Sequence, residues 1–376
     1  MINRELINLV EKNLFKNKAI IILGARQTGK TTLLKYFYDK FKNETLFLDC
    51  DETIVREQLQ DASSQKLRRL LGNAKVIFID EAQRVKNIGL SLKIIKDQIP
   101  EKQLIVSGSS SLDLANEINE PLTGRKFEYY LYPISFGELV AHKNLITIQS
   151  DLEQRMIYGM YPDIINNVGD EIALLKNLAG SYLYKDLLSY KEIRKPALLE
   201  KLLQALALQI GNEVSFSELA GLLQIDKQTI EKYVYLLEQA FIIFRLAPLS
   251  RNLRNELSKM RKIYFWDTGI RNALISNFNP INLRNDAGAL WENFLISERL
   301  KKNHYHEKYG NYFFWRTHQQ QEIDFIEEYD GKMHAFEFKW NPKAKVRFPK
   351  TFLDAYPEHE TAIVHRDNYV DFLMED

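Results

Sequence analysis

The first third of the chain alternates short apolar runs with stretches whose apolar positions repeat at helical spacing. The apolar runs cover residues 20–23, 45–48, 76–79 and 103–107, and an aromatic run covers 127–132. Runs this short and this poor in charge are typical of strands buried on both faces, as in parallel sheets. The stretches between them have the spacing of amphipathic helices. This alternation predicts an α/β fold with a parallel sheet and a site at the carboxyl ends of its strands.

A loop bracketed by glycines follows the first run and fits G-x-x-x-x-G-K-[ST] at every fixed position. It consists of Gly24, Ala25, Arg26, Gln27, Thr28, Gly29, Lys30, Thr31 and Thr32. In such a loop backbone N–H groups converge on a phosphate, the lysine adds a charge and the threonine hydroxyl of Thr31 binds Mg²⁺. The alternative is a strand, a glycine-rich turn and a helix without a ligand. The flanking strand and helix patterns favour the first interpretation, so we expect ATP and Mg²⁺ as cofactors.

Polar residues also end the third and fourth apolar runs. Asp80 and Glu81 follow residues 76–79, and Ser107 is followed by serines at 109, 110 and 111. Next to a phosphate loop, Asp80 is expected to hold Mg²⁺ and Glu81 to orient or deprotonate the attacking water. The alternative for the two acids is a helix cap. Ser107 is expected near the γ-phosphate, and a flexible loop serine is the alternative for it.

Arg125 directly precedes the aromatic run. Its guanidinium could neutralise charge on the transferring phosphoryl group, either within the chain or from a neighbouring chain. For a single arginine, a surface ion pair is an equal alternative. The sequence therefore predicts Asp80, Glu81 and Arg125 as catalytic residues of a P-loop NTP hydrolase.

These motifs together resemble the bacterial and archaeal ATPases of the AAA+ type. The resemblance rests on the phosphate loop, on Phe-Ile-Asp-Glu-Ala-Gln at 78–83, on Ser-Gly-Ser-Ser at 107–110 and on residues 122–125 and 132–136. More narrowly, nearly the whole chain resembles the subgroup that carries a winged helix and a nuclease-like domain after the ATPase. The chain departs from that subgroup at Ala25, where proline is usual. This loosens the loop's preorganisation but removes no phosphate ligand.

Residues 136–190 repeat their apolar positions as helices do, with an interruption at 159–162. From the residues alone, this part is a helical connector. In the resembled subgroup it would be a helical lid, and Tyr-Lys-Asp at 184–186 would match its closing stretch.

A helix–turn–helix pattern follows. One helix ends at Gly211, a short helix over 218–223 is capped at Ser217, a third over 228–240 is capped by Asp226, and 241–246 is predicted as a strand. This order predicts a winged helix–turn–helix with a recognition helix for DNA. Packing or protein contact is at least as good an interpretation, because acids offset the lysines of the third helix. Basic residues that could contact phosphates follow it: Arg251, Arg254, Lys259, Arg261 and Lys262.

Asp-Gly at 330–331 lies between two alternating stretches and predicts a hairpin. A symmetric loop sets Asp324 opposite Glu337. One face then receives Glu322, Asp324, Glu337 and Lys339, and the other Ile323, Phe325, Phe336 and Phe338. Facing carboxylates destabilise a sheet unless a cation lies between them, so the pair predicts a divalent metal site. The alternative is a charged solvent face, and a loop one residue longer or shorter would change the register.

Glu337-Phe338-Lys339 with an upstream aspartate resembles the PD-(D/E)xK nuclease fold. The resemblance implies that Asp324 and Glu337 are catalytic metal ligands, that Lys339 is the catalytic lysine, and that Glu292, on a helix predicted over 288–301, is a further metal-binding acid. A basic stretch without acids follows and is a candidate track for nucleic-acid phosphates: Lys343, Lys345, Arg347 and Lys350.

Length, composition and charge limit the class of protein and its cellular location. A length of 376 residues predicts several domains, and 45% hydrophobic with 27% charged residues is typical of a globular protein. A net charge of +1 provides no general attraction for nucleic acid, so any such contact must be local. One cysteine, Cys50, excludes an intramolecular disulfide framework, and no apolar run approaches about 20 residues. We therefore expect a cytoplasmic protein without a membrane partner.

The sequence thus predicts four domains: a P-loop ATPase core over 1–135, a helical lid over 136–194, a winged helix–turn–helix over 195–255 and a restriction-endonuclease-like domain over 256–376. The expected function is an ATP-hydrolysing switch coupled to a nuclease-like domain that acts on or binds nucleic acid. The alternative is a nucleotide-gated scaffold whose inert C-terminal domain binds a partner protein. The residues leave open the oligomeric state and whether Arg125 acts in cis or in trans.

Overall fold

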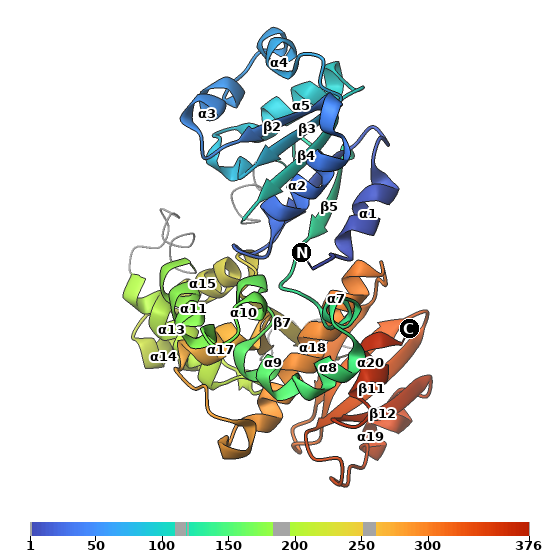
Figure 1. Ribbon diagram of the computed structural model, residues 1–376. Helices are drawn as coiled ribbons and strands as arrows, with labels where there is room; N and C mark the ends of the chain where they lie inside the picture. Colours follow the sequence, from blue (N-terminus) through green and yellow to red (C-terminus); the bar gives the residue numbers. More distant parts are fainter. Residues whose placement is uncertain (1, 110–117, 119, 183–195, 251–260, 376) are drawn as a thin grey trace. The chain divides into compact units, whose positions relative to one another are not determined.

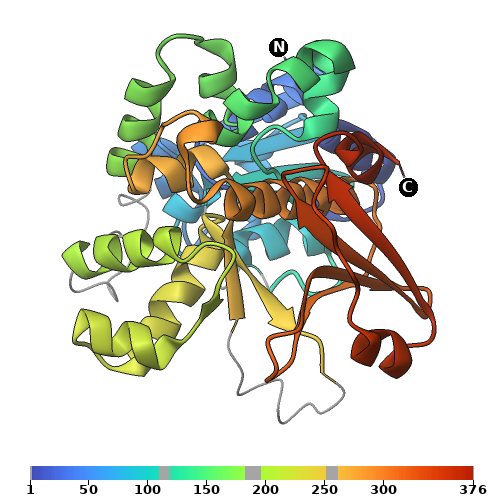
Figure 2. The same ribbon diagram turned by 90° about the horizontal axis from the view of Figure 1, so that it is seen from below.

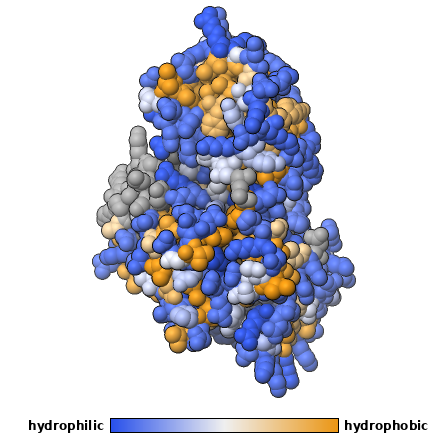
Figure 3. Space-filling model, in the orientation of Figure 1, coloured by the Kyte–Doolittle hydropathy of each residue, from blue (hydrophilic) through white to orange (hydrophobic). Residues whose placement is uncertain are grey.

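The computed structural model describes residues 2–109, 118, 120–182, 196–250 and 261–375 (Figure 1). The chain divides into two compact units, residues 1–134 with 239–241, and residues 135–238 with 242–376. The domain boundaries predicted at 194/195 and 255/256 fall inside the second unit and stay predictions. Hydrophilic residues prevail on the face shown in Figure 3, where apolar residues gather in smaller patches.

The first unit is built on a parallel sheet with the strand order β2-β3-β4-β1-β5. The strands are β1 Ala19–Leu23, β2 Thr45–Asp49, β3 Val76–Asp80, β4 Gln103–Gly108 and β5 Lys126–Tyr130. Every residue of β1, β3 and β4 is buried, which explains why these runs carry almost no charge. The predicted α/β fold with a parallel sheet is confirmed.

Helices precede and connect these strands. They are α1 Leu6–Asn13, α2 Lys30–Lys40, α3 Thr53–Leu59, α4 Ser64–Leu71 and α5 Ile88–Gln98, with 3₁₀ turns η1 Lys42–Glu44 and η2 Ala82–Arg84. Helix α2 begins directly after Gly29, whose φ of 99° lies in a region that glycine adopts at little cost. The buried Leu33 and Phe37 of this helix are four residues apart, as the sequence predicted.

The second unit begins with short helices. They are α7 Phe136–His142, α8 Leu145–Ser150, α9 Leu152–Tyr158, α10 Pro162–Asn166, α11 Glu171–Asn177 and the π-helical turn η3 Leu178–Tyr182. The predicted interruption is confirmed, because α9 ends at Tyr158 and α10 begins at Pro162. The stretch 184–186 lies outside the described residues.

Three further helices, α13 Pro196–Leu208, α14 Phe216–Leu223 and α15 Lys227–Gln239, cover the predicted helix–turn–helix. Asp226 caps α15 as predicted, since its carboxylate accepts a hydrogen bond from the Thr229 N–H at 2.7 Å. The predicted cap at Ser217 is wrong. The hydroxyl of Ser215 instead accepts from the Glu218 N–H at 3.3 Å, so α14 begins at Phe216.

A mixed sheet with the order β12-β11-β10-β9-β7-β8-β6 runs through the second unit. Its strands are β6 Glu213–Val214, β7 Ile243–Pro248, β8 Arg261–Phe265, β9 Asn311–Arg316, β10 Glu322–Tyr329, β11 Lys332–Lys339 and β12 His359–His365. The remaining helical elements are α17 Thr268–Leu274, η4 Ile281–Leu283, α18 Ala287–Tyr305, α19 Lys350–Ala355 and α20 Tyr369–Met374. Helix α18 packs against β8, β11 and α20 (Figure 2). Among the described ranges, no helix is both long and apolar enough to cross a membrane.

The predicted hairpin is confirmed, and β10 pairs with β11 in the predicted register, with Phe325 opposite Phe336. One part of the face assignment is wrong. Ile323 packs in a cluster with Ile326 and Ala335 rather than with Phe325. The pairing of β10 with β9 shifts register between Ile323 and Ile326, and such a bulge re-aims side chains.

Candidate functional site

The phosphate loop joins β1 to α2 and has the conformation that its glycines permit. Gln27 and Gly29 both have positive φ, at 61° and 99°. A Cβ at Gly24 would lie 2.2 Å from the carbonyl oxygen of Leu131, so no larger residue fits there without a shift of the backbone. The pattern of fixed glycines in the sequence therefore has a steric cause at Gly24 and a conformational cause at Gly29.

The loop is held closed by hydrogen bonds to its own carbonyl groups. The buried Lys30 Nζ donates to the carbonyl oxygens of Gly24 at 2.9 Å and Ala25 at 2.8 Å. The hydroxyl of Thr28 donates to the Ala25 carbonyl at 2.9 Å. A cationic side chain thus lies inside the loop, where an incoming phosphate would exchange for the carbonyl contacts.

Arg4 supports this loop and was missed in the sequence. Its guanidinium donates to the carbonyl oxygens of Thr28 and Tyr132, each at 2.6 Å. The side chain is buried, and its planar fork can hold two acceptors at once. No motif marks Arg4, because the bonds join residues 24 and 128 positions apart in the chain.

The carboxyl ends of β3 and β4 bring together three predicted site residues. The Ser107 hydroxyl donates to the Asp80 carboxylate. The Glu81 N–H donates to Asp80 Oδ1 at 3.1 Å and to Ser107 Oγ at 3.3 Å. Neither acid makes the alternative helix cap, since η2 has no side-chain cap bond. The roles of these residues in catalysis stay predictions.

The donor set at this edge fits a divalent cation. Asp80 is 2% exposed, and within the ranges that the structure describes no lysine, arginine or histidine pairs with it. A buried carboxylate is normally paired with a cation or bound to a metal. Carboxylate and hydroxyl oxygens are ligands that Mg²⁺ accepts.

The placement of Arg125 argues against a role in cis. Its carbonyl accepts from the N–H of Ala19, at the opposite end of β1 from the phosphate loop. Its Nε pairs with Asp97 Oδ1 at 2.6 Å, and both side chains are about 40% exposed. The surface ion pair that the sequence left open is therefore present, and a role in trans stays a prediction.

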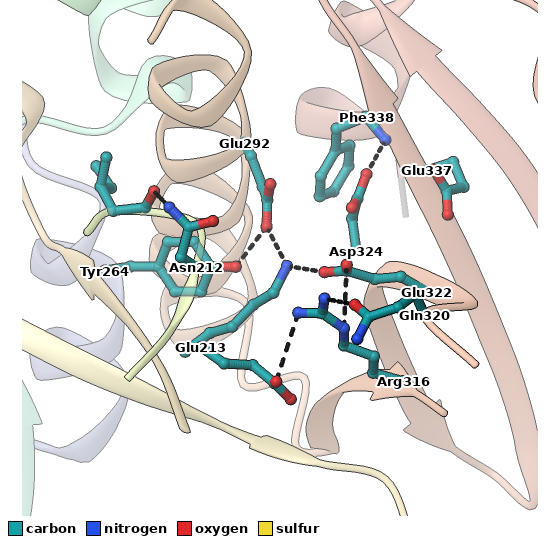
Figure 4. Close-up of polar contacts among 12 residues, drawn as sticks. Asn212, Glu213, Tyr264, Glu292, Arg316, Gln320, Glu322, Asp324, Glu337 and Phe338 are labelled. Carbon is teal, nitrogen blue, oxygen red and sulfur yellow. Dashed lines mark hydrogen bonds and ion pairs between the residues drawn. The ribbon is translucent and has the colours of Figure 1, made fainter. Parts of the chain in front are cut away.

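The second predicted site lies in the second unit (Figure 4). Lys339 Nζ lies 2.6 Å from Glu337 Oε2 and 3.4 Å from Asp324 Oδ2. The same Asp324 oxygen accepts the Phe338 N–H at 2.8 Å. The hairpin thus brings together the three predicted residues, with the lysine between the two carboxylates.

Glu292 of α18 lies in the same region and contacts a second lysine. Lys262 Nζ lies 3.0 Å from Glu292 Oε1 and 2.5 Å from Glu322 Oε1, and the Tyr264 hydroxyl donates to Glu292 as well. Lys262 is buried, so its predicted contact with nucleic-acid phosphates is wrong. The sequence contains no sign of the contact between Lys262 and Glu292. Lys262 lies on β8, which pairs with β6 and β7 and is distant in sequence from the β10–β11 hairpin.

Burial raises the pKa of two carboxyls in this region. Desolvation raises the pKa of Glu292 to about 7, although the Lys262 charge and the Tyr264 hydrogen bond favour the ionised form. Desolvation, together with the Asp324 charge, raises the pKa of Glu337 to about 7. The charges of Lys262 and Lys339 oppose this effect, because each ammonium group favours the ionised form of its carboxyl partner.

The described part of the chain contains no group of three His, Cys, Asp or Glu side chains arranged to hold a metal ion. Lys262 and Lys339 instead place ammonium groups between the carboxylates. This explains how like charges can share the face without a metal. The metal-ligand roles of Asp324, Glu337 and Glu292 stay predictions.

The predicted basic stretch is exposed. Between Asn341 and Lys350, the apolar positions are partly covered, whereas the basic positions face solvent, and Phe348 packs against the core cluster around Trp315. Across the described ranges, the four basic side chains have no ion-pair partner. They are Lys343, Lys345, Arg347 and Lys350.

Three family models match separate parts of the chain. Residues 16–140 match the AAA domain, residues 149–281 match a domain of unknown function (DUF8612), and residues 287–374 match a domain of unknown function (DUF4143). The phosphate loop and the parallel sheet lie within the region that is similar to the AAA domain, which supports a P-loop ATPase.

Relatives that match most of the chain have low sequence identity to it. The chain is 26% identical to the uncharacterized protein Rv2008c of Mycobacterium tuberculosis over 341 residues, which are 88% of this chain and 72% of that protein. It is 26% identical to the uncharacterized protein MJ1544 of Methanocaldococcus jannaschii over 347 residues, which are 87% and 75%.

The similarity to solved structures covers a smaller part of the chain. A crystal structure of Pif1 helicase from Candida albicans has a TM-score of 0.26 and 15% identity over 48% of each chain. A structure of Pif1 helicases at forked double-stranded DNA has a TM-score of 0.24 and 13% identity, over 47% of this chain and 52% of that chain. The chain spans about half of the length of these helicases.

Proposed function

We propose that the chain is an ATP-hydrolysing switch of the AAA type. The observation that carries this is the meeting of three strand ends: the phosphate loop follows β1, Ser107 lies near the end of the neighbouring β4, and Asp80 ends β3 on the other side of β4. In a parallel sheet, ligands bind at this edge.

Each residue of this edge has a distinct task. The N–H groups of the loop and Lys30 bind the phosphates, while the Thr31 hydroxyl and Asp80 hold Mg²⁺. Bound Mg²⁺ neutralises charge that develops on the phosphoryl oxygens. Glu81 accepts a hydrogen bond from the attacking water and orients it toward the γ-phosphate.

Calorimetric titration with ATP and Mg²⁺, together with phosphate release, tests this proposal. Lys30→Ala should abolish tight ATP binding because it removes the cation inside the loop. Lys35→Ala is the matched control, since Lys35 lies on the same helix and is exposed. Unchanged ATP affinity in Lys30→Ala would contradict the proposal.

We further propose that the second unit acts on or binds nucleic acid. The grouping of Asp324, Glu337 and Lys339 supports a nuclease-like site, with Glu292 nearby. The three helices α13 to α15 and the antiparallel strands β6, β8 and β7 support a winged helix–turn–helix. The exposed basic stretch at 343–350 supports contact with phosphates.

A second candidate is the nucleotide-gated scaffold with an inert C-terminal domain. The two lysines favour it, because ammonium groups already neutralise the carboxylates that a metal would need. In this case a protein would be the partner of the second unit.

Cleavage of single- and double-stranded DNA with Mg²⁺ or Mn²⁺, with and without ATP, separates the two candidates. A nuclease loses cleavage in Asp324→Ala and Lys339→Ala, and keeps it in the control Lys332→Ala, a more exposed lysine of the same strand. No cleavage by folded, ATP-hydrolysing protein would favour the scaffold.

A further inference from the structure

The side chain of Gln83 joins the predicted catalytic glutamate to the end of β4. Its Nε2 donates to Glu81 Oε2 at 2.6 Å and to Ser109 Oγ at 2.8 Å. A carboxylate only accepts hydrogen bonds, so the amide must present its NH₂ group here. We infer that Gln83 is a positioning residue that sets the Glu81 carboxylate for the attacking water and couples it to Ser109. This inference rests on the proposed ATP hydrolysis.

The backbone of Glu81 is also fixed by β4. Its φ of 51° lies in the left-handed region, which is costly for a residue with a side chain and persists only where the surroundings enforce it. Its N–H donates to Ser107 Oγ at 3.3 Å. Glu81 is therefore tied to the β4 end twice, by its backbone through Ser107 and by its carboxylate through Gln83 and Ser109.

This arrangement leaves one carboxylate oxygen for chemistry. Glu81 Oε2 is used by Gln83, whereas Oε1 has no donor within the described ranges. Oε1 can therefore accept the hydrogen bond of the attacking water, and the Gln83 bond limits rotation of the carboxylate. Productive geometry of this kind raises the rate of reaction rather than the affinity for substrate.

The 3₁₀ turn η2 explains how Gln83, two positions after Glu81, can bind the Glu81 carboxylate. Residues 82–84 turn directly after β3, and the Arg84 N–H donates to the Glu81 carbonyl at 3.0 Å. The turn brings the Gln83 side chain back over the strand ends. A displacement of the β4 end would move Glu81 through the bonds to Ser107 and Gln83. The position of this strand end would therefore influence the rate of ATP hydrolysis.

The inference is tested by measuring steady-state ATP hydrolysis and ATP affinity for variants of Gln83 and Ser109. Gln83→Met keeps the length and removes the donor, so we expect kcat to fall about tenfold or more, with KM and ATP affinity within twofold. Ser109→Ala should lower kcat less, and Ser109→Thr should retain it because the hydroxyl remains. The double variant Gln83→Met with Ser109→Ala should be no slower than Gln83→Met alone, because both changes interrupt the same hydrogen-bonded link between Glu81 and Ser109.

Three results would overturn the inference: a kcat of Gln83→Met within twofold of the parent, multiplicative losses in the double variant, or equal losses in Ser109→Ala and Ser109→Thr. A purely structural role would lower the midpoint of thermal unfolding and leave kcat per folded molecule unchanged. Absence of hydrolysis in the unaltered chain is a separate outcome, which contradicts the proposed function itself and the inference with it.

Discussion

At the scale of single residues, Arg4 shows how a distant side chain can set the shape of a ligand loop. One guanidinium bonds to the carbonyls of Thr28 and Tyr132, so it fixes the loop that holds Lys30. Replacement of Arg4 by lysine keeps the positive charge but removes at least one of these two hydrogen bonds.

We therefore expect Arg4→Lys to weaken ATP binding several-fold, and Arg4→Ala about tenfold, because the loop must then be ordered by the nucleotide. Calorimetric titration measures both, with Lys35→Ala as the control for loss of a surface charge. Equal affinity of Arg4→Ala and the parent chain would show that the loop needs no such support.

His304 of α18 makes stability depend on pH. Burial lowers its pKa from 6.5 to about 4. The folded chain then binds fewer protons than the unfolded chain between these values, so this contribution is complete above pH 6.5 and is lost as pH falls toward 4. At about 1.4 kcal/mol per pKa unit, the loss reaches roughly 3 kcal/mol.

Thermal unfolding of His304→Gln from pH 7 to pH 4 tests this prediction. The variant should lose less stability on acidification than the parent. His318→Gln, which changes an exposed histidine, should follow the parent curve. Parallel curves for the parent and His304→Gln would contradict the prediction.

At the scale of elements, the break between α9 and α10 depends on close approach of the backbone to an aspartate. Asp267 caps α17 through the Ile270 N–H at 3.0 Å and also accepts the Met160 N–H at 2.6 Å. A Cβ at Gly159 would lie 2.1 Å from Asp267 Oδ1, at a φ of 76°. One buried carboxylate thus joins segments more than 100 residues apart.

Gly159→Ala should cost about 2–4 kcal/mol, because it combines a clash with a left-handed backbone. Gly169→Ala is a matched control, since it has a φ of 104° and open space around its Cβ. Midpoints of thermal unfolding should separate the two variants by several degrees. Similar midpoints would show that the Asp267 contact yields without cost.

The sequence predicted elements well where the pattern was local. The buried strands β1, β3 and β4, the Asp226 cap and the register of the hairpin all follow from neighbouring residues. The Ser217 cap was wrong because Ser215 fits the same pattern with Glu218 three residues later. The position of Ile323 was wrong because a bulge belongs to a strand pair and leaves no mark in one strand.

At the scale of the whole molecule, what the sequence missed are contacts between distant segments. Lys262 was predicted to contact nucleic-acid phosphates, whereas β8 buries it among carboxylates of α18 and β10. The sequence left open whether Arg125 acts in cis, acts in trans or forms a surface ion pair, and the structure places it at the end of β1 opposite the phosphate loop, paired with Asp97. Charge and spacing cannot report such placements, because topology decides which strand ends meet.

The basic stretch predicts a salt-dependent partner for the whole chain. If it contacts phosphates, changing Lys343, Lys345 and Arg347 together to alanine should weaken DNA binding and reduce the slope of log affinity against log salt by about 2–3. The control changes three exposed lysines of the first unit, Lys35, Lys86 and Lys93. An unchanged slope in the first variant would remove the stretch from the interface.

The most direct test of the proposed function is ATP binding and hydrolysis by the full chain with Mg²⁺, compared with Lys30→Ala and Glu81→Gln. We expect the unaltered chain to bind and hydrolyse ATP, Lys30→Ala to bind none tightly, and Glu81→Gln to bind ATP but hydrolyse it slowly. Tight binding by Lys30→Ala, or hydrolysis by Glu81→Gln at the parent rate, would contradict it.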